Sequence, residues 1–204
     1  MSELLCVTNR RLCDGDFPER IAAIADCRPA GIILREKDLP EEEYEALARQ
    51  VLAVCKARNV RCILHTFVPA ALRLGADAIH LPLPVLRRLT AEEKARFSVL
   101  GASCHSAEDA REARELGCTY ITAGHVFATD CKKGLPPRGL DFLRRVCRAV
   151  DIPVYAIGGV SAGNFADVLA AGAAGGCVMS GPMACGDVRE YFQEFQKAGE
   201  PHGI

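Results

Sequence analysis

The chain alternates eight times between a short apolar run and a segment of helical periodicity. The apolar runs lie at residues 4–8, 31–35, 60–64, 78–81, 98–103, 119–123, 153–157 and 175–179. Helical segments lie at 17–26, 41–58, 68–75, 91–97, 107–116 and 140–149, and further helical segments follow the last two runs. Apolar runs without polar alternation indicate strands that are covered on both faces. The pattern predicts a TIM (β/α)8 barrel in a single domain, residues 1–198, followed by a C-terminal tail, 199–204.

An open doubly wound sheet is the alternative fold. Such sheets usually have fewer strands and carry a Gly-rich turn after the first strand. Residues 8–16, which follow the first run, do not contain Gly-x-Gly-x-x-Gly. The closed barrel therefore remains the preferred prediction.

The charge distribution restricts the partners. The formal net charge is -1, with basic and acidic residues interspersed, whereas surfaces that bind nucleic acid or membranes are basic and clustered. No apolar stretch approaches the roughly 18 residues of a membrane span, and the first residues lack a signal-peptide pattern. We expect a cytoplasmic protein with a small-molecule partner and no nucleic-acid or membrane partner, and a homo-oligomer stays open.

The 11 cysteines do not read as a disulfide framework, because their number is odd and most lie in apolar runs. We expect reduced, buried thiols, as at Cys6, Cys62, Cys118 and Cys177. The sequence has no Cys-x-x-Cys, and Cys104-His105 lacks a partner pair at ligand spacing. A structural zinc site is therefore not expected.

In a TIM barrel, binding and catalytic side chains lie where strands end and the following loops begin. The residues at those positions include Thr8, Arg35, Lys37, His65, Thr66, Ser103, His105, His125, Gly158, Gly159, Ser180 and Gly181. The last two pairs follow the seventh and eighth runs, where barrels commonly bind phosphate through backbone N–H groups. The alternative is that these glycines only turn the chain. Arg35 and Lys37 are predicted to face the barrel mouth, with ordinary surface charges as the alternative.

The segment 124–139 is a long loop between a strand and a helix, and loops of this length are usually lids or binding loops. It contains His125, two lysines and an arginine. An imidazole with nearby cations suits an acid/base step on an anionic substrate, because it titrates near neutral pH. A hydrogen-bonded structural histidine is the alternative for His125. His80 and His105 are expected to be structural, and the role of His65 is left open.

The motifs together resemble the thiamine phosphate synthase superfamily, and within it the TenI-like thiazole tautomerases. The resemblance covers nearly the whole chain and rests on Leu-Arg-Glu-Lys at 34–37, Gly-Ala-Asp-Ala-Ile-His-Leu at 75–81, Gly-Ala-Ser-Cys-His-Ser at 101–106, Ala-Ile-Gly-Gly-Val at 156–160 and Val-Met-Ser-Gly at 178–181. The loop sequence Gly-His-Val-Phe-Ala-Thr-Asp-Cys-Lys-Lys-Gly at 124–134 is similar to the tautomerase version, in which His125 replaces the synthases' Pro.

The chain departs from the synthases where they hold magnesium and the diphosphate. The synthases carry a Gln two residues before the Arg, an Asn-Asp pair after the third strand and Gly-Gln-x-Asp after the fourth. Here those places hold Ile33, His65-Thr66 and Pro-Leu-Pro-Val at 82–85. Because a diphosphate leaving group needs a metal or an equivalent cluster of charge, coupling to a pyrimidine diphosphate looks disabled.

The resemblance implies a metal- and cofactor-independent isomerase of thiamine biosynthesis that converts the ylidene form of a carboxythiazole phosphate into its aromatic tautomer. His125 is the implied catalytic residue. The implied substrate-binding residues are Arg35, Lys37, Ser103, Thr129, Lys132, Gly158, Gly159, Met179 and Ser180. Which of Arg35, Lys37 and Lys132 faces the substrate carboxylate stays open. The alternatives are a thiamine phosphate synthase and a non-catalytic barrel that binds thiazole phosphate or regulates a partner.

Overall fold

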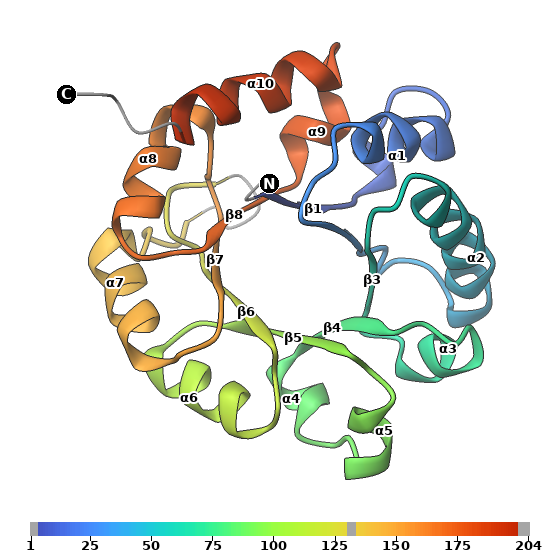
Figure 1. Ribbon diagram of the computed structural model, residues 1–204, viewed down its shortest axis with the longest axis horizontal. Coiled ribbons are helices and arrows are strands. Elements are labelled where there is room, and N and C mark those ends of the chain that lie inside the picture. The colour runs from blue at the N-terminus through green and yellow to red at the C-terminus, as the bar shows by residue number, and fades with distance from the viewer. Residues whose placement is uncertain (1–3, 130–133, 200–204) are drawn as a thin grey trace.

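The computed structural model describes residues 4–129 and 134–199. Its strands are β1 (Leu4–Val7), β2 (Gly31–Leu34), β3 (Cys62–His65), β4 (Ala78–Pro82), β5 (Val99–Cys104), β6 (Tyr120–Gly124), β7 (Val154–Ile157) and β8 (Gly175–Val178). Each strand pairs in parallel with the next, and β8 pairs with β1, so the ring closes (Figure 1). The predicted TIM barrel is confirmed.

Helices surround the ring of strands (Figure 1). They are η1 (Arg10–Leu12), α1 (Phe17–Asp26), α2 (Glu41–Ala57), α3 (Val68–Arg73), α4 (Leu83–Leu86), α5 (Ala91–Ala95), α6 (Ala107–Glu115), α7 (Gly139–Ala149), α8 (Ala162–Ala170), α9 (Ser180–Ala184) and α10 (Val188–Gly199). Within the described residues, no helix is both long and apolar enough to cross a membrane. Gly199, the first residue of the predicted tail, still belongs to α10, and the rest of that tail lies outside the described residues.

Two predicted boundaries were wrong. The third strand begins at Cys62 rather than at residue 60, because Val60 still donates its N–H to Cys55 O in the turn that ends α2. The helix predicted at 91–97 ends two residues early, and this part of the chain holds two short helices, α4 at Leu83–Leu86 and α5 at Ala91–Ala95. The second of them starts at a capping box in which Thr90 and Glu93 bind each other's backbone N–H groups.

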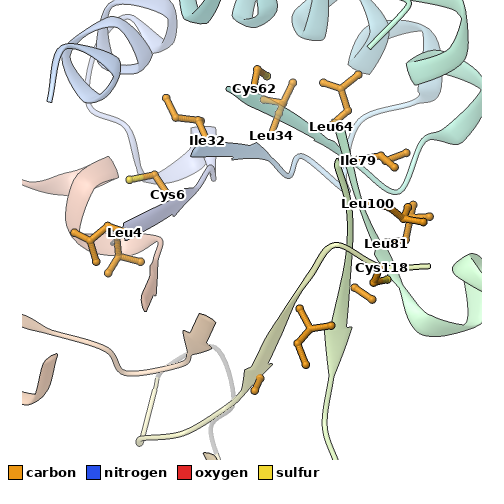
Figure 2. Close-up of a cluster of buried hydrophobic side chains, with 14 of the residues drawn as sticks. Leu4, Cys6, Ile32, Leu34, Cys62, Leu64, Ile79, Leu81, Leu100 and Cys118 are labelled. Atoms are coloured by element: carbon orange, nitrogen blue, oxygen red, sulfur yellow. The ribbon is translucent and has the colours of Figure 1, made fainter. Parts of the chain in front are cut away.

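The barrel has two apolar layers, because successive strand residues point to opposite faces. Outward-facing residues pack between the strands and the helices, among them Leu4, Cys6, Ile32, Leu34, Cys62 and Leu64 (Figure 2). Inward-facing residues fill the barrel, among them Leu5, Val7, Ile33, Ile63, Tyr120 and Cys177. Both faces of each strand are therefore buried, which explains the uninterrupted apolar runs.

The cysteines of the described part of the chain are free thiols. Cys6, Cys62, Cys118 and Cys177 are buried, as predicted. Burial raises the pKa of Cys104 and of Cys118 to about 12, so both stay protonated near neutral pH.

Candidate functional site

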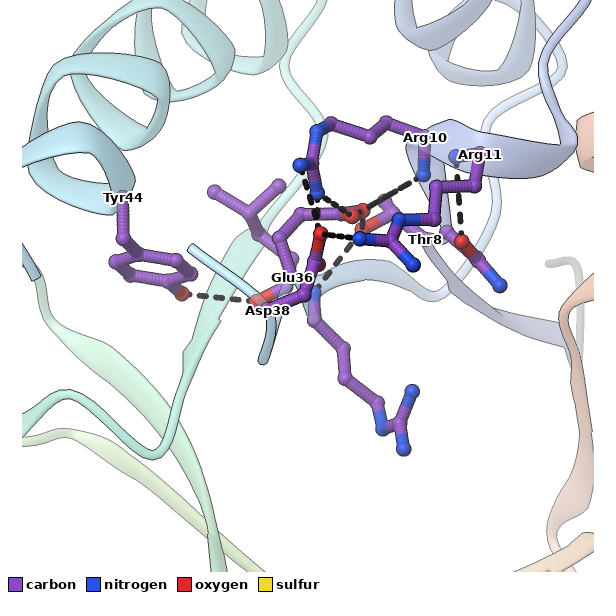
Figure 3. A network of polar contacts seen from close by, with 9 residues as sticks. Thr8, Arg10, Arg11, Glu36, Asp38 and Tyr44 are labelled. Carbon is purple, nitrogen blue, oxygen red and sulfur yellow. Dashed lines mark hydrogen bonds and ion pairs between the residues drawn. The ribbon is translucent and has the colours of Figure 1, made fainter. Parts of the chain in front are cut away.

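A buried carboxylate joins the ends of β1 and β2 at the barrel mouth (Figure 3). Glu36 is 2% exposed, and its Oε1 accepts the Thr8 hydroxyl at 2.6 Å and the Arg10 backbone N–H at 3.0 Å. The Arg10 guanidinium donates to Glu36 Oε2 at 3.2 Å and to Asp38 Oδ1 at 2.7 Å. The hydrogen bonds from the Arg10 guanidinium lower the pKa of the Asp38 carboxyl to about 2. Glu36 therefore holds the loop after β1 against the end of β2.

Arg35 and Lys37 flank Glu36 in the segment after β2, where Arg35 is half-buried and Lys37 is exposed. The Arg35 N–H donates to Thr8 Oγ1 at 3.0 Å, which fixes the backbone at that point. Both positive charges also act on the barrel interior, since Lys37 and then Arg35 help to lower the pKa of His65. The two cations predicted to face the mouth therefore lie near it.

His65 ends β3 inside the barrel and is 5% exposed. Its Nδ1 lies 2.6 Å from the Thr66 hydroxyl. Thr66 has a φ of 68°, a left-handed conformation that a β-branched residue rarely adopts, and its N–H donates to His80 O at 3.2 Å. Strained residues of this kind are concentrated at functional sites. The Thr66 turn thus holds the His65 ring in one orientation at the mouth.

His80 lies beside His65 on the paired strand β4, with ring centroids 5.8 Å apart. Its Nδ1 is 2.9 Å from the Tyr120 hydroxyl, and its Nε2 is 2.9 Å from Ser103 Oγ. Thr122 Oγ1 lies 3.5 Å from the same Nε2. This set forms a polar layer in the barrel interior, which agrees with the structural role expected for His80.

Both buried imidazoles are neutral at ordinary pH. Burial is the main cause that lowers the pKa of His65 to about 2, with the neighbouring His80 second. Burial also lowers the pKa of His80 to about 3, helped by the charge of Lys37. Neutral imidazoles can donate and accept hydrogen bonds at the floor of the site, but they are weak proton acceptors.

These pKa values predict that the protein begins to lose stability at a pH well above the pH range in which carboxylates titrate. In the unfolded chain both histidines take up protons below about pH 6.5, whereas in the folded protein they stay neutral down to about pH 3. Stability is therefore complete above about pH 6.5 and falls below it, by roughly 2 kcal/mol per histidine at pH 5. Urea unfolding at pH 7, 6 and 5 measures the effect.

His65→Asn is the control for this prediction, because it removes one of the two titrating groups. The variant should lose about half as much stability per pH unit as the parent protein. A free energy of unfolding that stays constant from pH 7 to pH 5 in the parent would show that the two rings take up protons in the folded protein as readily as in the unfolded chain.

His125 follows the last residue of β6 and is half-buried. Its Nε2 lies 3.4 Å from Leu135 O, a long contact in which only the imidazole can donate, because a carbonyl only accepts. Hydrogen bonds fix the backbone on both sides: Val126 N–H donates to Ile157 O at 2.9 Å, and Arg138 N–H donates to His125 O at 3.2 Å. His125 is thus held at the end of a strand, as a barrel catalytic residue is.

The two ends of the 125–139 loop are joined to each other. Gly139 N–H donates to Val126 O at 2.9 Å, next to the Arg138 bond to His125. Phe127 N–H donates to Gly158 O at 2.9 Å, which fastens the start of the loop to the end of β7. We call these bonds the loop clasp.

Gly158 and Gly159 have φ values of 94° and 68° and lie directly under this loop. A Cβ on Gly158 would meet His125 and come within 2.8 Å of its Cα. A Cβ on Gly159 would meet Ala128 O and come within 2.7 Å of Phe127 Cβ. The glycines are therefore required for the approach of the His125 loop, whether or not they also bind phosphate.

Backbone donors suited to an anion lie at the ends of β7 and β8. In residues 4–129 and 134–199, the N–H groups of Gly159 and Ser180 donate no hydrogen bond to another residue. Met179 packs partly buried against the inward-facing cluster. The arrangement fits the predicted phosphate cradle.

The remaining predicted residues are placed as follows. Ser103 points into the barrel, where its hydroxyl binds His80. Thr129 is half-buried beyond Ala128, and Lys132 lies outside the described residues. His105 is exposed, and its ring donates from Nδ1 to Gly124 O at 2.8 Å. Its backbone N–H donates to the Asp109 carboxylate.

Three residues of the site were missed as functional candidates. Glu36 was seen only as part of a motif, and Tyr120 only as part of a strand. Tyr44, on α2, accepts the His65 N–H at 2.9 Å and donates to Leu34 O at 2.8 Å, so it joins β2 to β3. A fully buried tyrosine on an otherwise apolar helix face is a signal for such a hydrogen bond.

The described strand ends offer little for a metal ion. No group of three or more His, Cys, Asp or Glu side chains in the described part of the chain is placed to hold one. The carboxylate nearest the mouth, Glu36, is already occupied by Thr8 and Arg10.

Comparison with known proteins identifies relatives along almost the whole chain. The sequence model of a family described as thiamine monophosphate synthase matches residues 4–181. A thiamine-phosphate synthase of Syntrophomonas wolfei is 32% identical over 204 residues, covering 97% of this chain and 96% of that protein. A thiamine biosynthesis bifunctional protein of Symbiobacterium thermophilum is 36% identical over 176 residues, 83% of this chain, and there the match spans only 36% of the longer relative.

Solved structures agree with the sequence relatives. A thiamine phosphate pyrophosphorylase from Pyrococcus furiosus superposes with a TM-score of 0.81 at 31% identity, covering 96% of this chain and 94% of that one. A 3-hexulose-6-phosphate synthase superposes with a TM-score of 0.70 at 17% identity, a likeness that shows the barrel fold alone.

Proposed function

The chain belongs to the thiamine monophosphate synthase family, and from that premise we propose that it is a thiazole tautomerase of thiamine biosynthesis. The substrate is the ylidene tautomer of a carboxythiazole ethyl phosphate. A proton leaves ring C2, a proton is added to the exocyclic ylidene carbon, and the ring becomes aromatic. Because aromatisation drives the reaction, the protein needs only to orient the ring and to move a proton.

The position of His125 carries this proposal. Its imidazole stands at the end of β6, in the place where the resemblance gives the synthases a proline, and the loop clasp and Gly158 fix its backbone. In the tautomer that donates from Nε2 to Leu135 O, Nδ1 can accept the C2 proton and then return a proton to the exocyclic carbon. A proline could do neither.

The rest of the mouth suits the two anionic groups of this substrate. The phosphate is assigned to the N–H groups of Gly159 and Ser180, since backbone donors at a helix start favour anions. Arg35 and Lys37, which follow the end of β2, are assigned to the carboxylate. Between them, the neutral pair His65 and His80 forms an uncharged polar floor for the thiazole ring.

Thiamine phosphate synthase is the second candidate, and the names of the relatives favour it. Coupling with release of diphosphate would call for a metal held by carboxylates at the mouth. The ends of β3 and β4 present His65, Thr66 and Pro82 instead, and Glu36 is already bound to Thr8 and Arg10. The donor groups at the described strand ends do not fit magnesium.

Chelation separates the two candidates. The protein should convert the ylidene tautomer at the same rate with and without EDTA, because no step uses a metal. With thiazole phosphate, the pyrimidine diphosphate and magnesium, it should release no diphosphate above background. A rate that is lost with EDTA and restored by magnesium, together with diphosphate release, would establish the synthase and reject the tautomerase.

Gly159→Val tests the phosphate assignment. The valine should weaken binding of the phosphorylated substrate by roughly 10- to 100-fold, because hydrogen bonds to charged groups contribute about 1.5–3 kcal/mol. Isothermal titration measures this. Since the valine also presses on Phe127 and Ala128, the dephosphorylated thiazole alcohol is the control. Equal weakening for both ligands would mean that loop displacement, not lost phosphate contact, is the cause.

A barrel that only binds thiazole phosphate is the third candidate. Single-turnover mixing of excess protein with the ylidene tautomer separates binding from chemistry. Tight binding without formation of the aromatic product would favour this binding module over an enzyme.

A further inference from the structure

A groove of about 420 Å³ lies outside the barrel, between α6 and α7, which are neighbours in the outer layer (Figure 1). Arginines dominate its lining. They are Arg111, Arg138, Arg145 and Arg148. The acidic side chain among the lining residues, Glu108, is 3.4 Å from the Arg111 guanidinium. The groove therefore carries an excess of positive charge although the whole chain has a net charge of -1.

Two of these arginines lack an acidic partner in the part of the chain that the structure describes. Within the described residues, Arg145 and Arg148 form no ion pair, whereas neighbouring Arg144 on α7 pairs with Asp141 at 2.7 Å. Both lie on one face of the helix together with Arg138, since residues three, seven and ten apart share a face. The Arg138 guanidinium is held over the Phe142 ring, 5.3 Å from its centroid. All three of these arginines line the same groove.

The opposite wall is the start of α6, where Ala107 and Glu108 line the groove. The positive end of the helix dipole lies there, and the acidic Glu108 and Asp109 of the first turn offset part of it. A helix start facing several guanidinium groups is an environment that binds phosphate oxygens, and arginine forks match phosphate bidentately. The volume is that of a small-molecule site rather than of a macromolecular surface.

We propose that this groove is a second anion site, separate from the barrel mouth, for a small organic phosphate or diphosphate. Its lining residues also contact the backbone around His125. His105 donates to Gly124 O at 2.8 Å, and Arg138 N–H donates to His125 O at 3.2 Å. Two residues that line the groove, His105 and Arg138, are therefore hydrogen-bonded directly to the backbone carbonyls of Gly124 and His125. A ligand bound in the groove would contact residues that hold the His125 backbone.

The test uses inorganic diphosphate as the probe, titrated calorimetrically into the full chain at low ionic strength. The Arg145→Gln/Arg148→Gln variant should bind it in the groove roughly 10- to 100-fold more weakly. Arg88→Gln/Arg96→Gln removes the same charge from exposed positions away from the groove and should bind like the parent. Arg145→Lys/Arg148→Lys should fall between, because lysine keeps the charge without the bidentate fork.

Amide NMR shifts locate the bound probe. In the parent, diphosphate should shift the amides of Ala107, Glu108 and Arg138, and the Gln variant should lose these shifts while shifts at Gly159 and Ser180 persist. If the Gln variant and the exposed-arginine control bind equally and show the same shifts, the groove site is rejected. The measurement does not depend on turnover, so failure of the tautomerase assay leaves this result intact, and the reverse also holds.

Discussion

His125→Gln should lower the turnover of the ylidene thiazole phosphate by roughly 10²- to 10⁴-fold, because positioned acid/base catalysis contributes that much. Glutamine keeps a similar length and can still donate to Leu135 O, as the imidazole Nε2 does. It cannot take up and return a proton near neutral pH. Binding through the phosphate and carboxylate should persist, so the rate should fall at nearly constant affinity.

Single-turnover rates and substrate affinity, measured on the same samples, check this result. His105→Gln is the matched control, since His105 is another histidine near the end of a neighbouring strand but donates to Gly124 O, a bond that a glutamine amide can replace. It should change the rate only a few-fold. Should His105→Gln abolish turnover while His125→Gln remains active, the proton carrier must be reassigned to His105.

Glu36→Ala should destabilise the fold by about 3 kcal/mol, because truncating one side of a buried charged network leaves its partners without hydrogen bonds. The Thr8 hydroxyl, the Arg10 N–H and the Arg10 guanidinium all lose an acceptor. Since Thr8 also accepts the Arg35 N–H, the loop next to Arg35 should loosen. Urea unfolding followed by far-UV circular dichroism measures the loss of stability.

Asp38→Ala is the control for this variant. Asp38 binds the same Arg10 guanidinium, but its side chain is 31% exposed, whereas that of Glu36 is 1% exposed. Water can replace the lost acceptor at Asp38, so the destabilisation should be clearly smaller. Equal losses for the two variants would mean that the buried bonds to Thr8 and the Arg10 backbone do not contribute.

The barrel could be predicted from the sequence because its cause is local. Each strand has both faces packed, one against helices and one against the barrel interior, so the apolar runs are continuous and easily counted. The ends of the strands can then be located in the sequence. Their positions predict that four residues lie near one another at the barrel mouth, namely Arg35, His125, Gly158 and Ser180. Where a boundary prediction was wrong, as at Val60, a backbone bond to Cys55 in the preceding turn decided the outcome.

The partners of those residues could not be predicted, because they are set by register and distance in space. Glu36 binds Thr8 across 28 residues, and nothing near either one in sequence indicates the other. His65 meets His80 only because β3 and β4 pair them directly. Gly158 lies under His125 because Gly124 pairs with Ile157. A glycine predicted to bind phosphate is therefore also required for packing against His125.

The loop clasp holds the backbone at residue 125 in place independently of the sequence of the loop that follows it. Arg138 and Gly139 bind back to His125 and Val126, so the loop leaves and rejoins the barrel at one point. Lengthening such a closed loop has a small entropic effect, about 0.6 kcal/mol for each doubling of its length. The segment can therefore be exchanged or randomised as a cassette for new substrates while the side chain at position 125 keeps its place, which makes this barrel a favourable starting point for laboratory evolution.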